Sequence, residues 1–260
     1  MCESNFAKVD RFRQYHRDLI AHALSKGNHR FTAIHSNVLL CCILDRIAKA
    51  GAPHLDRIGD RFKAVVEQYA DWADANRVSI LHLARVLMSP NLPDAFNDVK
   101  RRVDHDLGRK LPEHQNQIFL TNDPLLHEVE NYWPTNNNGN FIQIDGFVPE
   151  LLTHSNMLWL YRNSMVHEYS KPERGSESPF RREHNPYYQK LQTFIGITPQ
   201  DTAIWHENWE MVYPTAFITD IVRKVLEGVC DDFRSQNTSP FSFYSEGTYW
   251  NPKLNLKNDS

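Results

Sequence analysis

The sequence contains no long apolar segment. No stretch reaches the roughly 18 consecutive apolar residues that a transmembrane helix needs. Residues 1–18 are polar and charged, without the apolar centre of a secretory signal peptide. Both absences predict a soluble, cytoplasmic protein with no membrane partner.

Cysteine is scarce, with four residues in a chain of 260, and no Cys-x-x-Cys pair occurs. Cys41 and Cys42 are neighbours inside an apolar helical pattern, which is a poor basis for a disulfide framework. We therefore expect both to be buried, reduced thiols in a reducing compartment.

Metal-binding patterns are also missing, although the chain has 13 histidines. No His-Glu-x-x-His sequence or paired acidic cluster supports a metal site, and the histidines of residues 1–35 do not have the i, i+4 spacing of helical metal ligands. We expect neither a metal nor another cofactor, and a metal hydrolase ranks last among the functions considered. The net charge of −3 argues against broad attraction to nucleic acid or anionic lipid, so a polyanion would have to meet a local basic patch.

Apolar residues at helical spacing are what the sequence has in abundance. Hydrophobic residues make up 41% of the chain and aromatic residues 12%, enough to bury a core in one large or two small domains. Their recurrence predicts helices near residues 36–51, 57–75, 81–87, 94–111 and 214–233. The helix near residues 94–111 is strongly charged and is expected to be solvated. Partial alternation over residues 187–213 is compatible with a small β-hairpin before the last helix.

The predicted fold class is all-α, a helical bundle with one long insertion. We divide the chain into an N-terminal helical extension, residues 1–35, a helical domain, residues 36–235, and a C-terminal tail, residues 236–260. Residues 112–145 lack helical periodicity and contain the loop sequence Asn-Asn-Asn-Gly-Asn. They form the insertion, which separates the early helices from a helix that begins near Pro149.

The helix predicted between Pro149 and Pro172 carries the side chains of greatest chemical interest, which are Arg162, Asn163 and His167. Apolar residues around them can anchor the helix in a core. Asn163 and His167 share a helical face, whereas Arg162 and His167 are five residues apart, roughly 140° around an α-helix. This offset is awkward within one chain, so we predict a homodimer in which two copies of the motif surround one cleft.

These three groups suit the cleavage of a phosphodiester bond in RNA. An imidazole titrates near neutral pH, so His167 can take a proton from a ribose 2′-hydroxyl or give one to the departing oxygen. The guanidinium of Arg162 offers permanently charged donors to phosphate oxygens, and Asn163 can orient the imidazole or the phosphate. A 2′-hydroxyl nucleophile requires no metal, leaves a cyclic phosphate and spares DNA.

The segment Arg162–His167, which reads Arg-Asn-Ser-Met-Val-His, resembles the Arg-Asn-x3-His signature of HEPN domains, the higher eukaryotes and prokaryotes nucleotide-binding family. The overall organisation of residues 36–235 is similar as well. The resemblance implies an all-α bundle that dimerises with its motif helices facing each other. It also implies, in many members, a metal-independent endoribonuclease of toxin–antitoxin or phage-defence systems. On this resemblance Arg162 and His167 are the catalytic pair, and Asn163 supports them.

Binding partners are less closely defined by the sequence. The basic side chains after the motif either hold the RNA backbone or belong to an ordinary solvated loop; they are Lys171, Arg174, Arg181 and Arg182. The resemblance is compatible with an antitoxin or a nucleotidyltransferase-like partner. The alternative to a ribonuclease is a non-catalytic HEPN-like module that binds RNA or nucleotides or mediates oligomerisation, in which Arg162 and His167 stabilise the dimer or hold a nucleotide.

Overall fold

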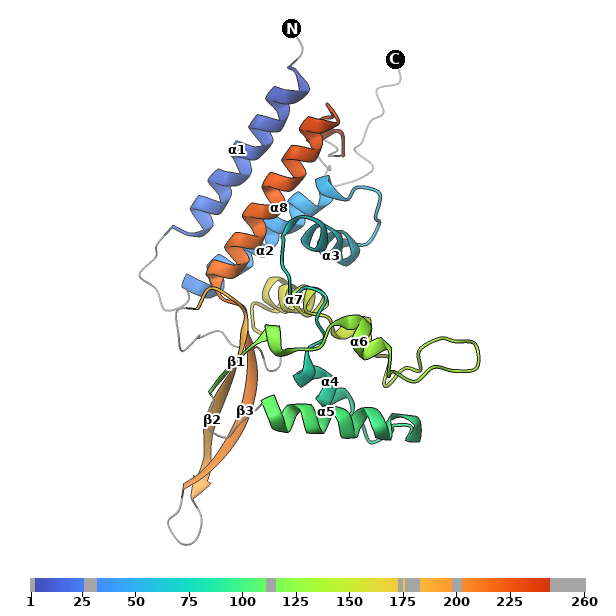
Figure 1. Cartoon of the computed structure of the whole chain (residues 1–260). Helices are drawn as coiled ribbons and strands as arrows, with labels where there is room; N and C mark the ends of the chain where they lie inside the picture. The colour runs from blue at the N-terminus through green and yellow to red at the C-terminus, as the bar shows by residue number, and fades with distance from the viewer. Residues whose placement is uncertain are drawn as a thin grey trace, which may run out of the picture.

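The computed structural model describes residues 3–25, 32–110, 116–172, 175, 183–197 and 203–243. In these residues the fold is mostly helical, with one small antiparallel sheet (Figure 1). The helices are α1 (Asn5–Ala23), α2 (Thr32–Gly51), α3 (Ile58–Tyr69), α4 (Ile80–Val86), α5 (Asn97–Lys110), α6 (Leu126–Glu130), α7 (His154–Asn163) and α8 (Thr215–Ser235). The strands are β1 (Gln117–Phe119), β2 (Tyr187–Ile197) and β3 (Ala203–Val212). No helix in the described part of the chain is long and apolar enough to span a bilayer.

The sheet shows that the all-α prediction is too narrow. The predicted hairpin is confirmed as strands β2 and β3, which project from the helices as a long arm (Figure 1). Strand β1 pairs with β2 and comes from residues 112–145, as does α6, so this insertion is more regular than predicted. A strand of three residues and a helix of five are too short to give a recognisable period. The Asn-rich loop is confirmed, since Oδ1 of Asn136 accepts from the backbone N–H groups of Asn138 and Asn140.

Helices α1, α2, α3 and α8 form the main bundle. Their apolar faces share one core with α7 and the sheet, and this core includes Phe12, Leu44, Phe62, Leu158, Tyr188 and Val222. Full burial of one such side chain stabilises a fold by roughly 1.5–3 kcal/mol. Helix α8 comes close to α3 at Gly228, where a Cβ atom would lie 2.5 Å from Cδ1 of Tyr69. Through α1, residues of the predicted N-terminal extension also enter this core.

The described cysteines, Cys41, Cys42 and Cys230, are free thiols. Cys41 and Cys230 are buried, and burial raises the pKa of Cys230 to about 11. Cys42 is exposed, so its predicted burial is wrong. Successive residues point about 100° apart on an α-helix, and Cys42 therefore faces away from the core that Cys41 enters.

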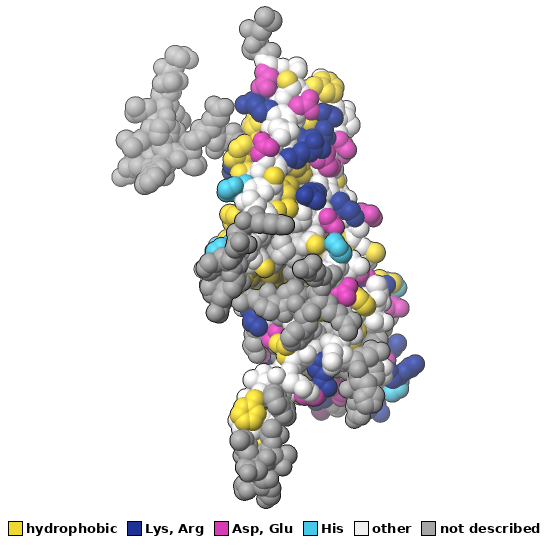
Figure 2. Space-filling view, turned by 90° about the vertical axis from the view of Figure 1, so that its left-hand side faces the viewer, with side chains coloured by type: hydrophobic (Ala, Val, Ile, Leu, Met, Phe, Trp, Pro, Cys, Tyr) yellow, Lys and Arg dark blue, Asp and Glu magenta, His cyan; other side chains and the backbone are white. Residues whose placement is uncertain are grey.

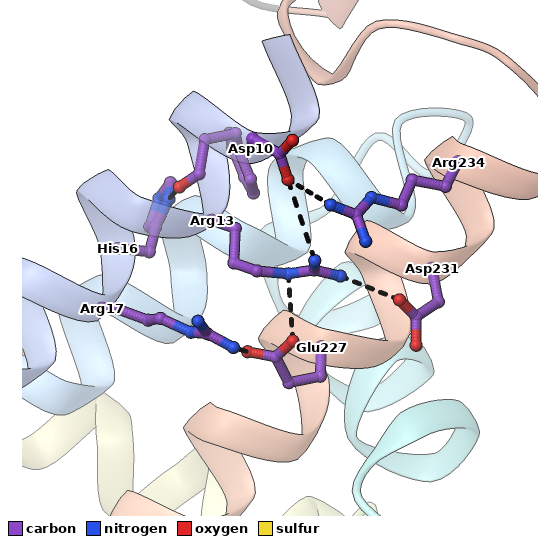
Figure 3. Close-up of polar contacts among 8 residues, drawn as sticks. Asp10, Arg13, His16, Arg17, Glu227, Asp231 and Arg234 are labelled. Atoms are coloured by element: carbon purple, nitrogen blue, oxygen red, sulfur yellow. Dashed lines mark hydrogen bonds and ion pairs between the residues drawn. The ribbon is translucent and has the colours of Figure 1, made fainter. Parts of the chain in front are cut away.

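An ion-pair network joins α1 to α8 (Figure 3). Arg13 lies 3.0 Å from Glu227 and 2.8 Å from Asp231, and Arg17 lies 2.8 Å from the same Glu227. The Arg13 side chain is 11% exposed, so its pairs are less screened by solvent than ordinary surface pairs. On the face shown in Figure 2, acidic and basic side chains are mixed over the upper helical part of the molecule, which therefore shows no broad field of one sign there.

His16 of α1 is a buried neutral imidazole (Figure 3). Its Nδ1 donates to the backbone oxygen of Phe12 at 2.8 Å. Burial, together with the charge of Arg46, lowers the pKa of His16 from 6.5 to about 4, although the hydrogen bond to Phe12 acts in the opposite direction. Between these two pH values the unfolded chain binds a proton that the folded chain does not, so stability is lost as the pH falls.

We expect this histidine alone to reduce the free energy of unfolding by about 3 kcal/mol between pH 7 and pH 4. The loss begins below about pH 6.5, where the unfolded imidazole titrates, and is complete below the folded pKa of about 4. The measurement is urea unfolding of wild type and His16→Asn at pH 7, 5.5 and 4, because asparagine retains an N–H donor for Phe12 but does not titrate. An identical pH dependence in both proteins would contradict the expectation.

Candidate active site

The predicted motif helix is present, and its hydrogen-bonding pattern changes within the motif. A 3-10 turn over Pro149–Leu152 leads into α7, and Ser164–Glu168 continues α7 as a π-helix. The helix is anchored in the core by Met157, Leu158, Tyr161 and Met165. Tyr169, in the left-handed region with a φ of 53°, ends the helix before Pro172, where the sequence predicts it to end.

The π turn accompanies a contact between Arg162 and His167 within a single chain. Nη1 of Arg162 lies 3.1 Å from Nε2 of His167 and donates to Oδ1 of Asn163 at 2.9 Å. Residues five apart diverge on an α-helix, but a π-helix closes its hydrogen bonds between residues i and i+5 and so brings such residues toward one face. The predicted awkwardness of the single-chain geometry is therefore wrong, because the two groups meet without a second copy.

This contact indicates which ring nitrogen of His167 accepts a hydrogen bond. Arginine nitrogens only donate, so Nε2 of His167 accepts and carries the lone pair. The imidazole is exposed, and an accepting Nε2 corresponds to the tautomer with its hydrogen on Nδ1.

A carboxylate that the motif does not indicate completes the site. Asp45 of α2 accepts from Nε of Arg162 at 2.8 Å and also from Nη2. Arg162 is 6% exposed, and its Cζ lies 5.0 Å from the ring centroid of Trp159. Burial raises the pKa of Asp45, while the hydrogen bonds and charge of Arg162 act in the opposite direction. The sequence does contain a signal for this role: Asp45 is the one acidic residue in the apolar pattern of α2, and a buried charge requires a partner of opposite sign.

The donors of Arg162 are largely committed inside the chain. One N–H on Nε and one on Nη2 point to Asp45, and Nη1 serves Asn163 and His167. Four of the five N–H donors of a guanidinium are thus in use. A phosphate would bind the remaining donor or displace one of these contacts, so the resting Arg162 chiefly orients its neighbours.

The motif opens onto a cavity of about 620 Å³. Its polar lining comes from the motif and from α4, through Asn163, Ser164, His167, Glu168 and His82. The rest of the lining is mainly apolar and aromatic, and includes Phe147, Leu160, Tyr161, Met211 and Tyr213. A few polar groups on an otherwise apolar wall, around a space of this size, are typical of a ligand-binding site.

Of the four basic residues predicted to hold RNA, Lys171 is the one within the described residues. Its Nζ lies 3.2 Å from Oε1 of Glu210 on β3, so the positive charge is already paired. The next residue, Pro172, lines the cavity, which places Lys171 near its edge. The other three lie outside the described residues; they are Arg174, Arg181 and Arg182.

Across the ranges that the structure describes, no group of three or more His, Cys, Asp or Glu side chains could hold a metal ion. Comparison of the chain with protein-family models, with curated proteins and with solved structures finds no match.

Proposed function

We propose that this chain is a metal-independent endoribonuclease of HEPN type, which cleaves RNA by attack of a ribose 2′-hydroxyl on the adjacent phosphate. The observation that carries the proposal is the contact of Arg162, Asn163 and His167 beside a cavity of about 620 Å³. A base, a permanent positive charge and an amide donor are the groups that this reaction needs. A helix anchored in the core holds them more rigidly than a loop would.

In this proposal His167 is the base. Its Nε2 takes the proton of the 2′-hydroxyl, the 2′-oxygen bonds to phosphorus, and the bond from phosphorus to the 5′-oxygen breaks. Nη1 of Arg162 turns from the imidazole to a phosphate oxygen, where negative charge builds up. Asp45 holds the rest of the guanidinium in place during this movement. The products are a 2′,3′-cyclic phosphate and a 5′-hydroxyl.

A homodimer remains part of the proposal. Leu160 and Tyr169 flank the motif and are 42% and 52% exposed, which leaves apolar surface beside a polar site. A second copy would cover this surface, and two facing motif helices would extend the cavity into a groove for an RNA strand. A role in toxin–antitoxin or phage-defence systems, with an antitoxin or a nucleotidyltransferase-like partner, follows from the resemblance.

The second candidate is a non-catalytic module that binds RNA or nucleotides or mediates oligomerisation. The observation in its favour is the buried pair of Arg162 and Asp45, which commits most of the guanidinium donors to the chain itself. In that case the motif would tie α7 to α2, and His167 would have no proton to transfer.

The purified protein is expected to cleave single-stranded RNA in excess EDTA. It should leave intact the same strand with one 2′-deoxyribose at the cleavage position, because the nucleophile is then missing. Mass spectrometry of the products should find the cyclic phosphate. No cleavage of a broad RNA set, together with thermal stabilisation by RNA or nucleotides, would favour the second candidate. Cleavage of the deoxy-substituted strand at the same position would contradict 2′-hydroxyl attack.

A further inference from the structure

A second imidazole reaches the same cavity at the end of a buried hydrogen-bonded chain. His82 of α4 lines the cavity, and its Nδ1 lies 2.7 Å from Oγ of Ser79. This Oγ lies 2.8 Å from the hydroxyl of Tyr188, which donates to Oδ2 of Asp123 at 2.6 Å. Nε2 of His154 lies 2.7 Å from the same Oδ2. The chain therefore runs without a break from a buried carboxylate to the cavity wall.

The members behind His82 are removed from solvent. Ser79, Tyr188 and Asp123 are 0%, 1% and 2% exposed. Among the described residues, Oδ1 of Asp123 and Nδ1 of His154 have no hydrogen-bond partner, although unpaired polar atoms at such depth are costly. The buried carboxylate of Asp123 is held by Tyr188 of β2 and by His154 of α7.

The hydrogen positions follow from the carboxylate at the end of the chain. Burial, together with the charge of Asp123, raises the pKa of Tyr188 well above its usual value, so the phenol keeps its proton and donates it to Asp123. The phenol oxygen then accepts from Ser79, which uses the one hydroxyl hydrogen of Ser79. Ser79 can only accept from His82, so Nδ1 of His82 carries a hydrogen. Nε2 is therefore the nitrogen of His82 that gains and loses a proton.

We propose that His82 is the general acid that protonates the departing 5′-oxygen, and that Ser79, Tyr188 and Asp123 are positioning residues that act through it. This inference rests on the proposed ribonuclease activity and supplies the proton donor that the proposal needs once His167 acts as the base. Nδ1 of His82 donates to Ser79 in both protonation states, so the chain does not rearrange when Nε2 titrates. The carboxylate at its far end fixes the direction of each hydrogen bond in the chain.

The proton balance closes with two imidazoles. His167 takes the 2′-hydroxyl proton as the 2′-oxygen bonds to phosphorus. The electron pair of the breaking bond goes to the 5′-oxygen, which takes the proton from Nε2 of His82. Solvent removes one proton from His167 and returns one to His82, so no further reactant is needed. The attacking and departing oxygens lie on opposite sides of phosphorus, and two groups on separate elements suit this geometry.

The test uses two RNA substrates, one ordinary and one with sulfur in place of the departing 5′-oxygen, because a thiolate departs without protonation. His82→Asn retains an N–H donor for Ser79 but supplies no proton. We expect it to cleave ordinary RNA about 100-fold more slowly than wild type, and the sulfur substrate within about threefold of wild type. Tyr188→Phe, which interrupts the chain, should lose about tenfold on ordinary RNA and little on the sulfur substrate.

Two variants provide matched comparisons. His167→Ala should be slow on both substrates, because the base acts before the bond to the departing atom breaks. His127→Asn, at an exposed position of α6, should be unchanged on both. Nitrogen NMR of the wild-type imidazoles provides a reading that needs no turnover, since neutral His82 should carry its hydrogen on Nδ1.

Equal losses of His82→Asn on the two substrates would overturn the acid role, as would a wild-type rate on ordinary RNA. A hydrogen on Nε2 of neutral His82 would overturn the positioning chain. If the wild-type protein cleaves neither substrate, the proposed function fails and the acid role fails with it. Thermal unfolding identifies variants that do not fold, and His82→Gln then replaces His82→Asn in the same comparison.

Discussion

His167→Ala is expected to slow RNA cleavage by about 10³-fold. The variant lacks the proposed base, whose Nε2 lies 3.1 Å from Nη1 of Arg162. The side chain is exposed, so its removal should change the free energy of unfolding by less than about 0.5 kcal/mol. Single-turnover cleavage of labelled RNA in EDTA measures the first quantity, and urea unfolding the second. The matched control is His105→Ala on the solvated α5, where the side chain is 66% exposed.

Because His167 contacts Arg162, a variant of Arg162 provides a second test of the same site. Arg162→Lys keeps a positive charge beside Asp45 but lacks the forked group that serves Asn163 and His167. We expect it to lose about 100-fold in rate when His167 is present, and little more when His167→Ala is already in place, since groups that act as a unit are not additive. Full additivity of the two losses would show that Arg162 acts independently of His167. An active His167→Ala protein would remove the catalytic assignment altogether.

Asp45→Ala is expected to lower the free energy of unfolding by about 3–5 kcal/mol. The change leaves the guanidinium of Arg162, which is 6% exposed, without its anionic partner in a site too dry to solvate it. Cleavage should fall as well, because a mobile guanidinium no longer holds Asn163 and His167. Urea unfolding at pH 7 measures the loss of stability, and the single-turnover assay measures the loss of rate.

Two comparisons show whether the loss of stability comes from the unpaired charge of Arg162 or from a general loss of packing. Asp71→Asn removes the charge that pairs with Lys224 at 3.5 Å, where the Asp71 side chain is 94% exposed, and should cost less than about 0.5 kcal/mol. Asparagine is used here because Asp71 has a φ of 48°, a conformation that asparagine tolerates and alanine does not. Asp45→Ala combined with Arg162→Met should regain most of the lost stability, because no unpaired charge remains. It should stay inactive. If both aspartate variants lose equally little stability, the buried pair contributes nothing that a surface pair does not.

The sequence predicted the motif helix, its end before Pro172 and the three side chains that meet in the structure. Apolar periodicity identifies which face of a helix is buried, and proline limits where a helix can end. The switch to π hydrogen bonding at Ser164–Glu168 leaves no comparable trace, because no residue type marks it. An α-helical wheel therefore placed Arg162 and His167 apart, although they are in contact.

Tertiary partners account for the rest of what the sequence did not predict. Asp45 and Arg162 are 117 residues apart, and no local pattern links them. The chain from Asp123 to His82 joins three separate segments, and none of its polar residues is unusual in its local sequence. Strand β1 has only three residues, and it forms because it pairs with the edge of β2. Such features are determined by packing between distant segments rather than by local propensity.

Helices α1 and α8 are joined by an ion pair between Arg13 and Asp231, which are 218 residues apart in the sequence. A ribosome must therefore synthesise nearly all of the described chain before the bundle can close, and bringing such distant segments together is entropically slow. Partial chains emerging during translation would lack the scaffold that seats α2 against α7. The pairing of Asp45 on α2 with Arg162 on α7 would then be held by the complete bundle only after α8 has been made.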